Sequence, residues 1–244
     1  MLSEWLASTA DRAMAAAVIR PSLRRTATEH APIDPDSPVE ARCFFHARAA
    51  SSALLLVHGY LGGRYAIEAR AWPVRRWFAR GHDVVLLTLP FHGVHGGPAR
   101  RIFEPEAIAK AIGDLRLMVQ RLRERGATRV AAMGMSLGGY LVSLLATLEP
   151  ALDLVVPVVP LADLSAFARG ELPVAPPRIT LRRAPVRMLV VGAERDAIAP
   201  LAHAHALASH FHAPLVTFRG GHVLQLGREA AFATIDRMLE RTGS

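Results

Sequence analysis

A serine, an aspartate and a histidine each follow a short apolar segment, in an order that could support nucleophilic catalysis. Residues 134–139 read Gly-Met-Ser-Leu-Gly-Gly, which places a glycine two positions to either side of Ser136. The apolar segment 129–133 predicts a buried strand before the serine, and residues 140–146 predict a helix after it. A serine at such a tight turn presents its hydroxyl for attack, and the flanking glycines are needed because a Cβ there would strike neighbouring backbone.

The acid and the base that such a serine requires follow two later predicted strands. Residues 186–192 are followed by a loop that contains Asp196, and residues 214–218 by a loop that contains His222. Parallel strands end at a common edge of a sheet, so we expect both loops to lie beside Ser136. The histidine would take the serine proton and the aspartate would orient the imidazole. These residues therefore predict a catalytic triad.

Other residues of the same types compete for these roles. The alternative carboxylates are Glu194, Asp153 and Asp163, and the alternative histidines are His203, His205, His210 and His212. Asp196 is favoured because it lies in the loop after the penultimate strand, at the rim where the serine is expected. The alternative histidines fall in or just after a helix predicted near residues 200–211, where solvent-facing side chains are expected. His222 is favoured because it follows the last strand, after two glycines that give the loop freedom.

A motif that follows an earlier predicted strand is the fourth element of the pattern. Residues 53–57 read as a short apolar strand that runs into His58-Gly59-Tyr60. Together with the serine turn and the order serine, acid, histidine, this motif resembles the α/β-hydrolase family over about residues 40–240. In that family, the loop after the early strand and the residue after the nucleophile donate two backbone N–H groups to the oxyanion. The resemblance implies that these donors are the amides of Tyr60 and Leu137.

The resemblance also implies an activity and a fold. It indicates a single-domain serine esterase or lipase that cleaves a carboxylic ester or thioester through an acyl-enzyme. Alternating strands and helices predict an α/β fold whose mostly parallel central sheet has helices on both faces. The helices are expected near residues 64–80, 104–125, 138–148, 200–211 and 227–241.

The domain boundaries follow from breaks in this alternation. Residues 41–244 are expected to form the α/β-hydrolase domain, with residues 161–185 as a small cap or lid. Residues 1–40 are expected to hold an amphipathic helix over residues 1–20, followed by a proline-containing linker.

Composition favours a compact soluble enzyme. Of the 244 residues, 51% are apolar, which suffices for one α/β domain. The single cysteine, Cys43, excludes an internal disulfide and agrees with a reducing compartment. No apolar stretch approaches the about 20 residues that a membrane span needs, and the first residues lack the features of a secretory signal. We therefore expect a cytoplasmic protein.

The net charge of +8 comes almost entirely from arginine, since Lys110 is the one lysine. The arginines are spread along the chain without a recognisable nucleic-acid motif, so we expect no nucleic-acid partner. Peripheral membrane contact through residues 1–20 is an alternative to packing of that helix on the domain. The spacing of His58, His92 and His95 fits no common zinc pattern, and we expect no metal or cofactor. His92 and His95 are expected to belong to a loop at the rim of the active site. His58 is expected to be a structural hydrogen-bonding residue of its loop.

Three alternatives to the esterase hypothesis remain open. The same triad could serve an acyltransferase or a lipase that acts on lipids, and a protein of this fold could bind a ligand without catalysis. A small-molecule ester or acyl compound is the expected substrate. The natural substrate, its acyl length and the oligomeric state are not indicated by the sequence.

Overall fold

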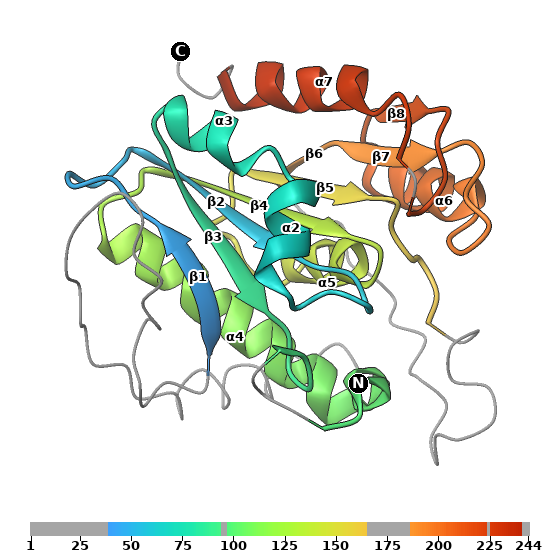
Figure 1. The fold of residues 1–244 in the computed structure, drawn as a ribbon, viewed down its shortest axis with the longest axis horizontal. Coiled ribbons are helices and arrows are strands. Elements are labelled where there is room, and N and C mark those ends of the chain that lie inside the picture. Colours follow the sequence, from blue (N-terminus) through green and yellow to red (C-terminus); the bar gives the residue numbers. More distant parts are fainter. Residues whose placement is uncertain (1–38, 94–96, 165–185, 224, 241–244) are drawn as a thin grey trace.

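The computed structural model describes residues 39–240 except 94–96, 165–185 and 224. The helix expected at residues 1–20, the linker after it and most of the cap expected at residues 161–185 lie outside this part of the chain. They remain predictions. The described residues build a central sheet with helices on both faces (Figure 1).

The sheet has eight strands, ordered β1-β3-β2-β4-β5-β7-β8, with β6 also paired to β5. Among the described strands, the β1–β3 pairing alone is antiparallel, and the other pairings are parallel. The strands are β1 (Glu40–Phe44), β2 (Ser52–Val57), β3 (His82–Thr88), β4 (Arg129–Met135), β5 (Leu154–Val158), β6 (Arg187–Met188), β7 (Val190–Ala193) and β8 (Leu215–Phe218). The predicted α/β fold with a mostly parallel sheet is confirmed.

The helices form two layers. They are α2 (Tyr65–Ala71), α3 (Val74–Ala79), the 3-10 helix η2 (Ala99–Phe103), α4 (Pro105–Glu124), α5 (Leu137–Ala146), α6 (Leu201–Phe211) and α7 (Glu229–Glu240). Buried side chains of α4, α5 and α6 share one apolar core with the sheet, and those of α3 and α7 share the other. Figure 1 shows α3 and α7 together on one side of the sheet, opposite α4. Among the described helices, none is both long and apolar enough to cross a bilayer.

The structure differs from the sequence-based expectation at three places. The helix expected near residues 64–80 is two helices, because Trp72 is extended (φ −105°, ψ 146°) before Pro73, as the proline ring requires of its predecessor. The strand expected over residues 186–192 is the two short strands β6 and β7. An additional strand, β1, covers the sheet edge beside β3, and its side chains alternate between half-buried and buried.

The register of the parallel strands determines which loops meet at the carboxyl edge. Val57 at the end of β2 lies opposite Gly134 of β4, and Met135 lies opposite Val158 of β5. Ala193, which ends β7, lies opposite Phe218, which ends β8. The loops after β2, β4, β7 and β8 therefore leave the sheet at the same edge, and these loops contain the predicted site residues.

Candidate active site

Ser136 occupies a strained turn between β4 and α5. Its φ of 56° and ψ of −116° are rare for a residue with a side chain, and such strain is held in place only where the surroundings determine it. The Ser136 N–H donates to the Val158 carbonyl oxygen at 2.9 Å, and the Ser136 carbonyl accepts from the Tyr140 N–H at 3.1 Å. The turn is thus tied both to the neighbouring strand and to its own helix.

The glycines around this turn allow close backbone contact. A Cβ on Gly134 would collide with the carbonyl of Gly138, and a Cβ on Gly138 would lie 2.5 Å from the carbonyl oxygens of both Val57 and His58. No side chain larger than hydrogen fits at either position without displacing backbone. The close approach of Gly138 to Val57 and His58 also places the first turn of α5 against the loop that begins with His58.

Asp196 and His222 are joined by a hydrogen bond between the loops after β7 and β8. His222 Nδ1 lies 2.7 Å from Asp196 Oδ2, and the aspartate side chain is fully buried. Asp196 Oδ1 accepts from the backbone N–H groups of Ile198 and Ala199 at 2.9 and 2.7 Å. With Nδ1–H donating to the carboxylate, His222 Nε2 is left as the basic nitrogen.

Backbone contacts beyond the strand ends hold these two loops side by side. The Glu194 N–H donates to the Phe218 carbonyl at 2.9 Å, and the Arg195 N–H donates to the Gly220 carbonyl at 3.1 Å. A Cβ on Gly221 would lie 3.1 Å from the Arg195 carbonyl oxygen, so the glycine permits close approach of the loops.

Gln225 connects the histidine loop to the serine turn. Its Nε2 donates to the His222 carbonyl at 3.2 Å and lies 4.0 Å from the sulfur of Met135, the residue before Ser136. The segment that carries His222 therefore lies against the end of β4. Asp196, His222 and the serine turn are brought together at one edge of the sheet.

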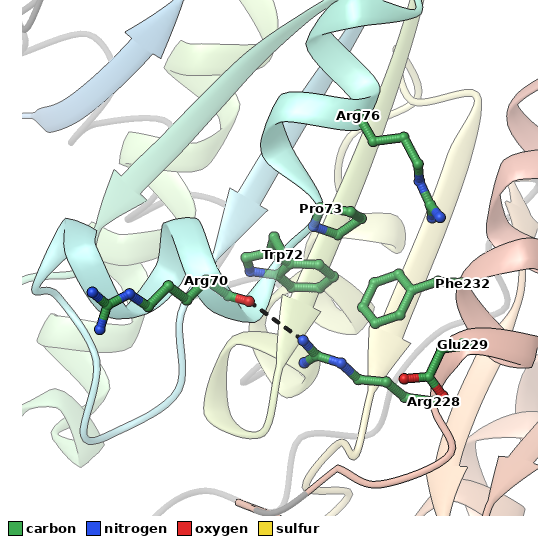
Figure 2. A pocket seen from close by; sticks show the side chains of 7 residues that line it. All are labelled: Arg70, Trp72, Pro73, Arg76, Arg228, Glu229 and Phe232. Carbon is green, nitrogen blue, oxygen red and sulfur yellow. Dashed lines mark hydrogen bonds between the residues drawn. The ribbon is translucent and has the colours of Figure 1, made fainter.

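Arg228 connects Gln225 to helix α2. Its Nη1 donates to Gln225 Oε1 at 3.0 Å, and its Nη2 lies 3.3 Å from the Arg70 carbonyl. Arg228 and Phe232 both line a surface hollow of about 260 Å³, and Figure 2 shows their side chains next to each other. The Arg228 guanidinium carbon is 5.2 Å from the centre of the Phe232 ring. The position of the histidine loop thus depends on a residue remote from Ser136.

The loop after β2 is shaped by the buried side chain of His58. His58 Nε2 accepts from the Leu89 N–H at 3.0 Å, so the proton must lie on Nδ1, which donates to the Gly59 carbonyl at 2.7 Å. The pKa of His58 is lowered from the usual 6.5 to about 4, chiefly by burial; the neighbouring His92 acts in the same direction and the hydrogen bond to Gly59 opposes it. The ring is therefore neutral at pH 7. His58 is a hydrogen-bonding residue of this loop, as expected from the sequence.

A second group of contacts orders the same loop. Glu68 Oε1 accepts from the Gly63 N–H at 2.9 Å, and His92 Nε2 lies 2.8 Å from the Tyr60 carbonyl oxygen. A Cβ on Gly59 would lie 3.2 Å from Ser136 Cβ, so Tyr60 follows a residue in near contact with the serine. The first N–H groups of α5, including that of Leu137, have no acceptor within their own helix.

The ring nitrogens of His58 and His92 are all engaged with backbone groups, since His92 Nδ1 also lies 2.9 Å from the Pro90 carbonyl. His95 lies outside the described residues. Within the described part of the chain, no group of three or more histidine, cysteine or carboxylate side chains could hold a metal ion.

Asp153, Glu194 and His203 are engaged with groups other than Ser136, Asp196 and His222. Asp153 bonds to Arg123 and to the Val130 N–H near the start of β4, at the opposite edge of the sheet. Glu194 is exposed and accepts from the Thr217 hydroxyl. The alternative histidines are half-buried or exposed, and His203 accepts from the Ala162 N–H.

Three residues that shape the site were not singled out for a role there by the sequence: Glu68, Gln225 and Arg228. His92 carried a partial signal, because it follows β3 at the active edge of the sheet. Glu68, Gln225 and Arg228 gave none, since their contacts depend on how the loops fold back on the sheet.

Comparison with curated proteins gives relatives of unassigned function. An uncharacterized protein of Mycobacterium tuberculosis, MT2702 in strain CDC 1551 and Rv2627c in strain H37Rv, is 33% identical over 124 residues. The match covers 46% of this chain, and the chain spans only 30% of the length of these relatives. No protein-family model matches the chain.

Solved structures identify the fold. Est1E from Butyrivibrio proteoclasticus with ferulic acid bound has a TM-score of 0.67 and 17% identity, covering 87% of this chain and 99% of that one. Acetyl xylan esterase from Paenibacillus sp. R4 has a TM-score of 0.69 and 16% identity, covering 98% and 93%. The Pyrococcus furiosus esterase Pf2001 has a TM-score of 0.66 and 16% identity, covering 92% and 98%. The chain therefore has the α/β-hydrolase fold.

The neutral state of buried His58 predicts a pH-dependent stability. The unfolded chain binds a proton at this residue below pH 6.5, whereas the folded chain does so only near pH 4. The contribution of His58 to the free energy of unfolding is complete above pH 6.5 and decreases by about 3 kcal/mol as the pH falls to 4. Denaturant titrations of the wild type and of His58→Asn should show a shallower decrease in the variant. His205→Asn, which replaces an exposed histidine, is the control and should follow the wild type. If the free energy of unfolding of His58→Asn falls with pH as steeply as that of the wild type, the prediction is wrong.

Proposed function

We propose that this protein is a serine hydrolase that cleaves a carboxylic ester or thioester through an acyl-enzyme on Ser136. The observation that carries the proposal is the 2.7 Å contact between His222 Nδ1 and Asp196 Oδ2, on loops packed beside the strained serine turn. The structures with the same fold that are named as esterases add support by analogy, since fold alone does not determine activity.

In the first half of the reaction, His222 Nε2 removes the proton from the Ser136 hydroxyl while Oγ attacks the substrate carbonyl carbon. The carbonyl π electrons move to oxygen, and the oxyanion accepts hydrogen bonds from the amides of Tyr60 and Leu137. When the tetrahedral intermediate collapses, the bond to the leaving group breaks. The leaving alcohol or thiol takes the proton from His222, and the acyl group remains on Ser136.

In the second half, a water molecule replaces the leaving group. His222 removes a proton from the water as it attacks the acyl carbon. The second tetrahedral intermediate collapses by breaking the bond between the acyl carbon and Ser136 Oγ, and His222 returns the proton to Oγ, which releases the carboxylic acid and free Ser136. Asp196 keeps the imidazole in the correct tautomer and stabilises the imidazolium in both halves. The two backbone N–H groups on Asp196 Oδ1 fix the carboxylate so that Oδ2 faces the histidine.

The surface around these loops favours a substrate with an apolar group. Among the described residues, the large apolar side chains that are exposed are Leu61, Ile198, Val223 and Leu226, at 47–80% exposure. Leu61 follows Tyr60, Val223 follows His222, and the other two lie within four residues of Asp196 or His222. Exposed apolar side chains gathered at one place indicate a binding surface, whereas scattered ones do not. We assign this apolar rim to the acyl or alcohol part of the ester.

The nucleophile is tested with a fluorophosphonate probe on folded protein. We expect one adduct, located at Ser136 by peptide mass spectrometry, because the probe reacts only with an activated serine. Ser136→Ala should abolish labelling. Ser143→Ala is the matched control, because Ser143 is a buried serine of α5 that bonds to the Gly139 carbonyl, and its loss should leave labelling intact. Folded protein that is unlabelled at Ser136 would refute the proposed function.

The apolar rim is tested with p-nitrophenyl acetate, butyrate and octanoate below their micellar concentrations. Leu226→Ser and Leu61→Ser should lower kcat/KM for the octanoate by about 3-fold to 10-fold, because each removes apolar contact with the chain. The acetate is too short to gain from this surface, so its kcat/KM should stay near that of the wild type and report an intact site. An equal loss on all three esters would contradict the assignment of the rim.

A further inference from the structure

We propose that His92 is a positioning residue that holds the Tyr60 segment so that the Tyr60 N–H faces the oxyanion. The proposal rests on the proposed function, because it takes this amide as an oxyanion-hole donor. It concerns a side chain in the loop after β3, outside the triad.

The imidazole of His92 is placed between two backbone acceptors. His92 is 5% exposed, with Nε2 2.8 Å from the Tyr60 carbonyl oxygen and Nδ1 2.9 Å from the Pro90 carbonyl oxygen. A carbonyl oxygen can only accept, and a neutral imidazole has one N–H to donate. The Nε2–H tautomer donates to the Tyr60 carbonyl, which is the contact that joins the two loops. The Pro90 contact is local, whereas the Tyr60 contact spans 32 residues.

The turn that carries His92 has a strained backbone at Phe91. The His92 N–H donates to the Leu89 carbonyl at 3.1 Å, which closes a four-residue turn with Phe91 in its third position at φ 63°. Glycine is the usual residue for a positive φ in a turn, and a bulky side chain there costs about 1–3 kcal/mol. The Phe91 ring is held under the Arg101 guanidinium, whose carbon lies 4.6 Å from the ring centre.

The same turn also engages His58. The Leu89 N–H at its start donates to His58 Nε2, and the His58 and His92 rings lie edge to face, 5.0 Å apart. His58 Nδ1 and the Gly62 N–H both donate to the Gly59 carbonyl. Two buried imidazoles thus hold consecutive carbonyls, those of Gly59 and Tyr60.

Holding these two carbonyls determines the direction of the Tyr60 amide. The Gly59 carbonyl and the Tyr60 N–H belong to one trans peptide unit, so the N–H points away from the Gly59 oxygen. The Tyr60 carbonyl belongs to the next unit, and its contact with His92 stops that unit from rotating. A donor that is fixed before the reaction needs no reorganisation when the oxyanion forms. Losing the His92 contact should therefore lower kcat more than it raises KM.

Two variants separate the contact to Tyr60 from the contact to Pro90. In His92→Gln the side-chain amide nitrogen can occupy the position of Nε2 and donate to the Tyr60 carbonyl. In His92→Asn it can reach the position of Nδ1 and the Pro90 carbonyl only. We expect His92→Gln to retain most of kcat, and His92→Asn to lose about tenfold in kcat with KM nearly unchanged. Thermal unfolding of both variants identifies any general loss of structure.

The opposite pattern would overturn the proposal. If His92→Asn keeps kcat while His92→Gln loses it, the Pro90 contact and the turn are what matter. Equal kcat in both variants, or a rise in KM alone, would also exclude a positioning role. Nitrogen-15 NMR of the wild-type imidazoles gives a readout independent of activity, and Nε2 of His92 should carry a proton. An unprotonated Nε2 would refute the contact itself. A wild-type protein that neither labels at Ser136 nor turns over any ester would instead refute the proposed function, and the role of His92 with it.

Discussion

The site depends on the close approach of backbone at the serine turn. Gly134 and Gly138 bring β4 and α5 into contact, and Gly138 also lies against the carbonyls of Val57 and His58. These contacts impose the strained, positive-φ conformation of Ser136 and, at the same time, place the loop after β2 beside it. The proposed nucleophile and the proposed oxyanion donors are therefore positioned by one set of backbone contacts, made before any substrate is present.

Hydrogen bonds between loops position the other residues of the site. Asp196 and His222 are aligned because the loops after β7 and β8 continue to bond beyond the strand ends. Gln225 and Arg228 connect the histidine loop to the end of β4 and to α2. The buried histidines of the β2 and β3 loops bond to backbone groups and are not available as bases. The site thus contains one partly buried histidine that is paired with an aspartate, and two buried histidines that hold the loops in place.

Sequence patterns predicted the sheet and the order of its helices because buried parallel strands read as short apolar runs. They also placed Ser136, Asp196 and His222 within a few residues of the ends of such runs, and the structure has these ends at one edge of the sheet. The catalytic roles of the three residues remain a proposal. The division of the expected helix 64–80 at Trp72 could have been predicted from Pro73. Strand β1 could have been predicted from the alternation of polar and apolar residues along it. The contacts of His92 and Arg228 could not, because they join segments 32 and 158 residues apart through loops without a periodic pattern. The contact of Glu68 with Gly63 is local, but it depends on the fold of a loop that has no such pattern either.

The most direct test of this account is a crystal structure of the protein after reaction with a p-nitrophenyl alkylphosphonate, which mimics the tetrahedral intermediate. The account predicts phosphorus bonded to Ser136 Oγ, one phosphonyl oxygen within hydrogen-bond distance of the Tyr60 and Leu137 N–H groups, and His222 Nε2 facing Oγ. A phosphonyl oxygen that points away from both amides, or an imidazole of His222 turned from Ser136, would contradict it.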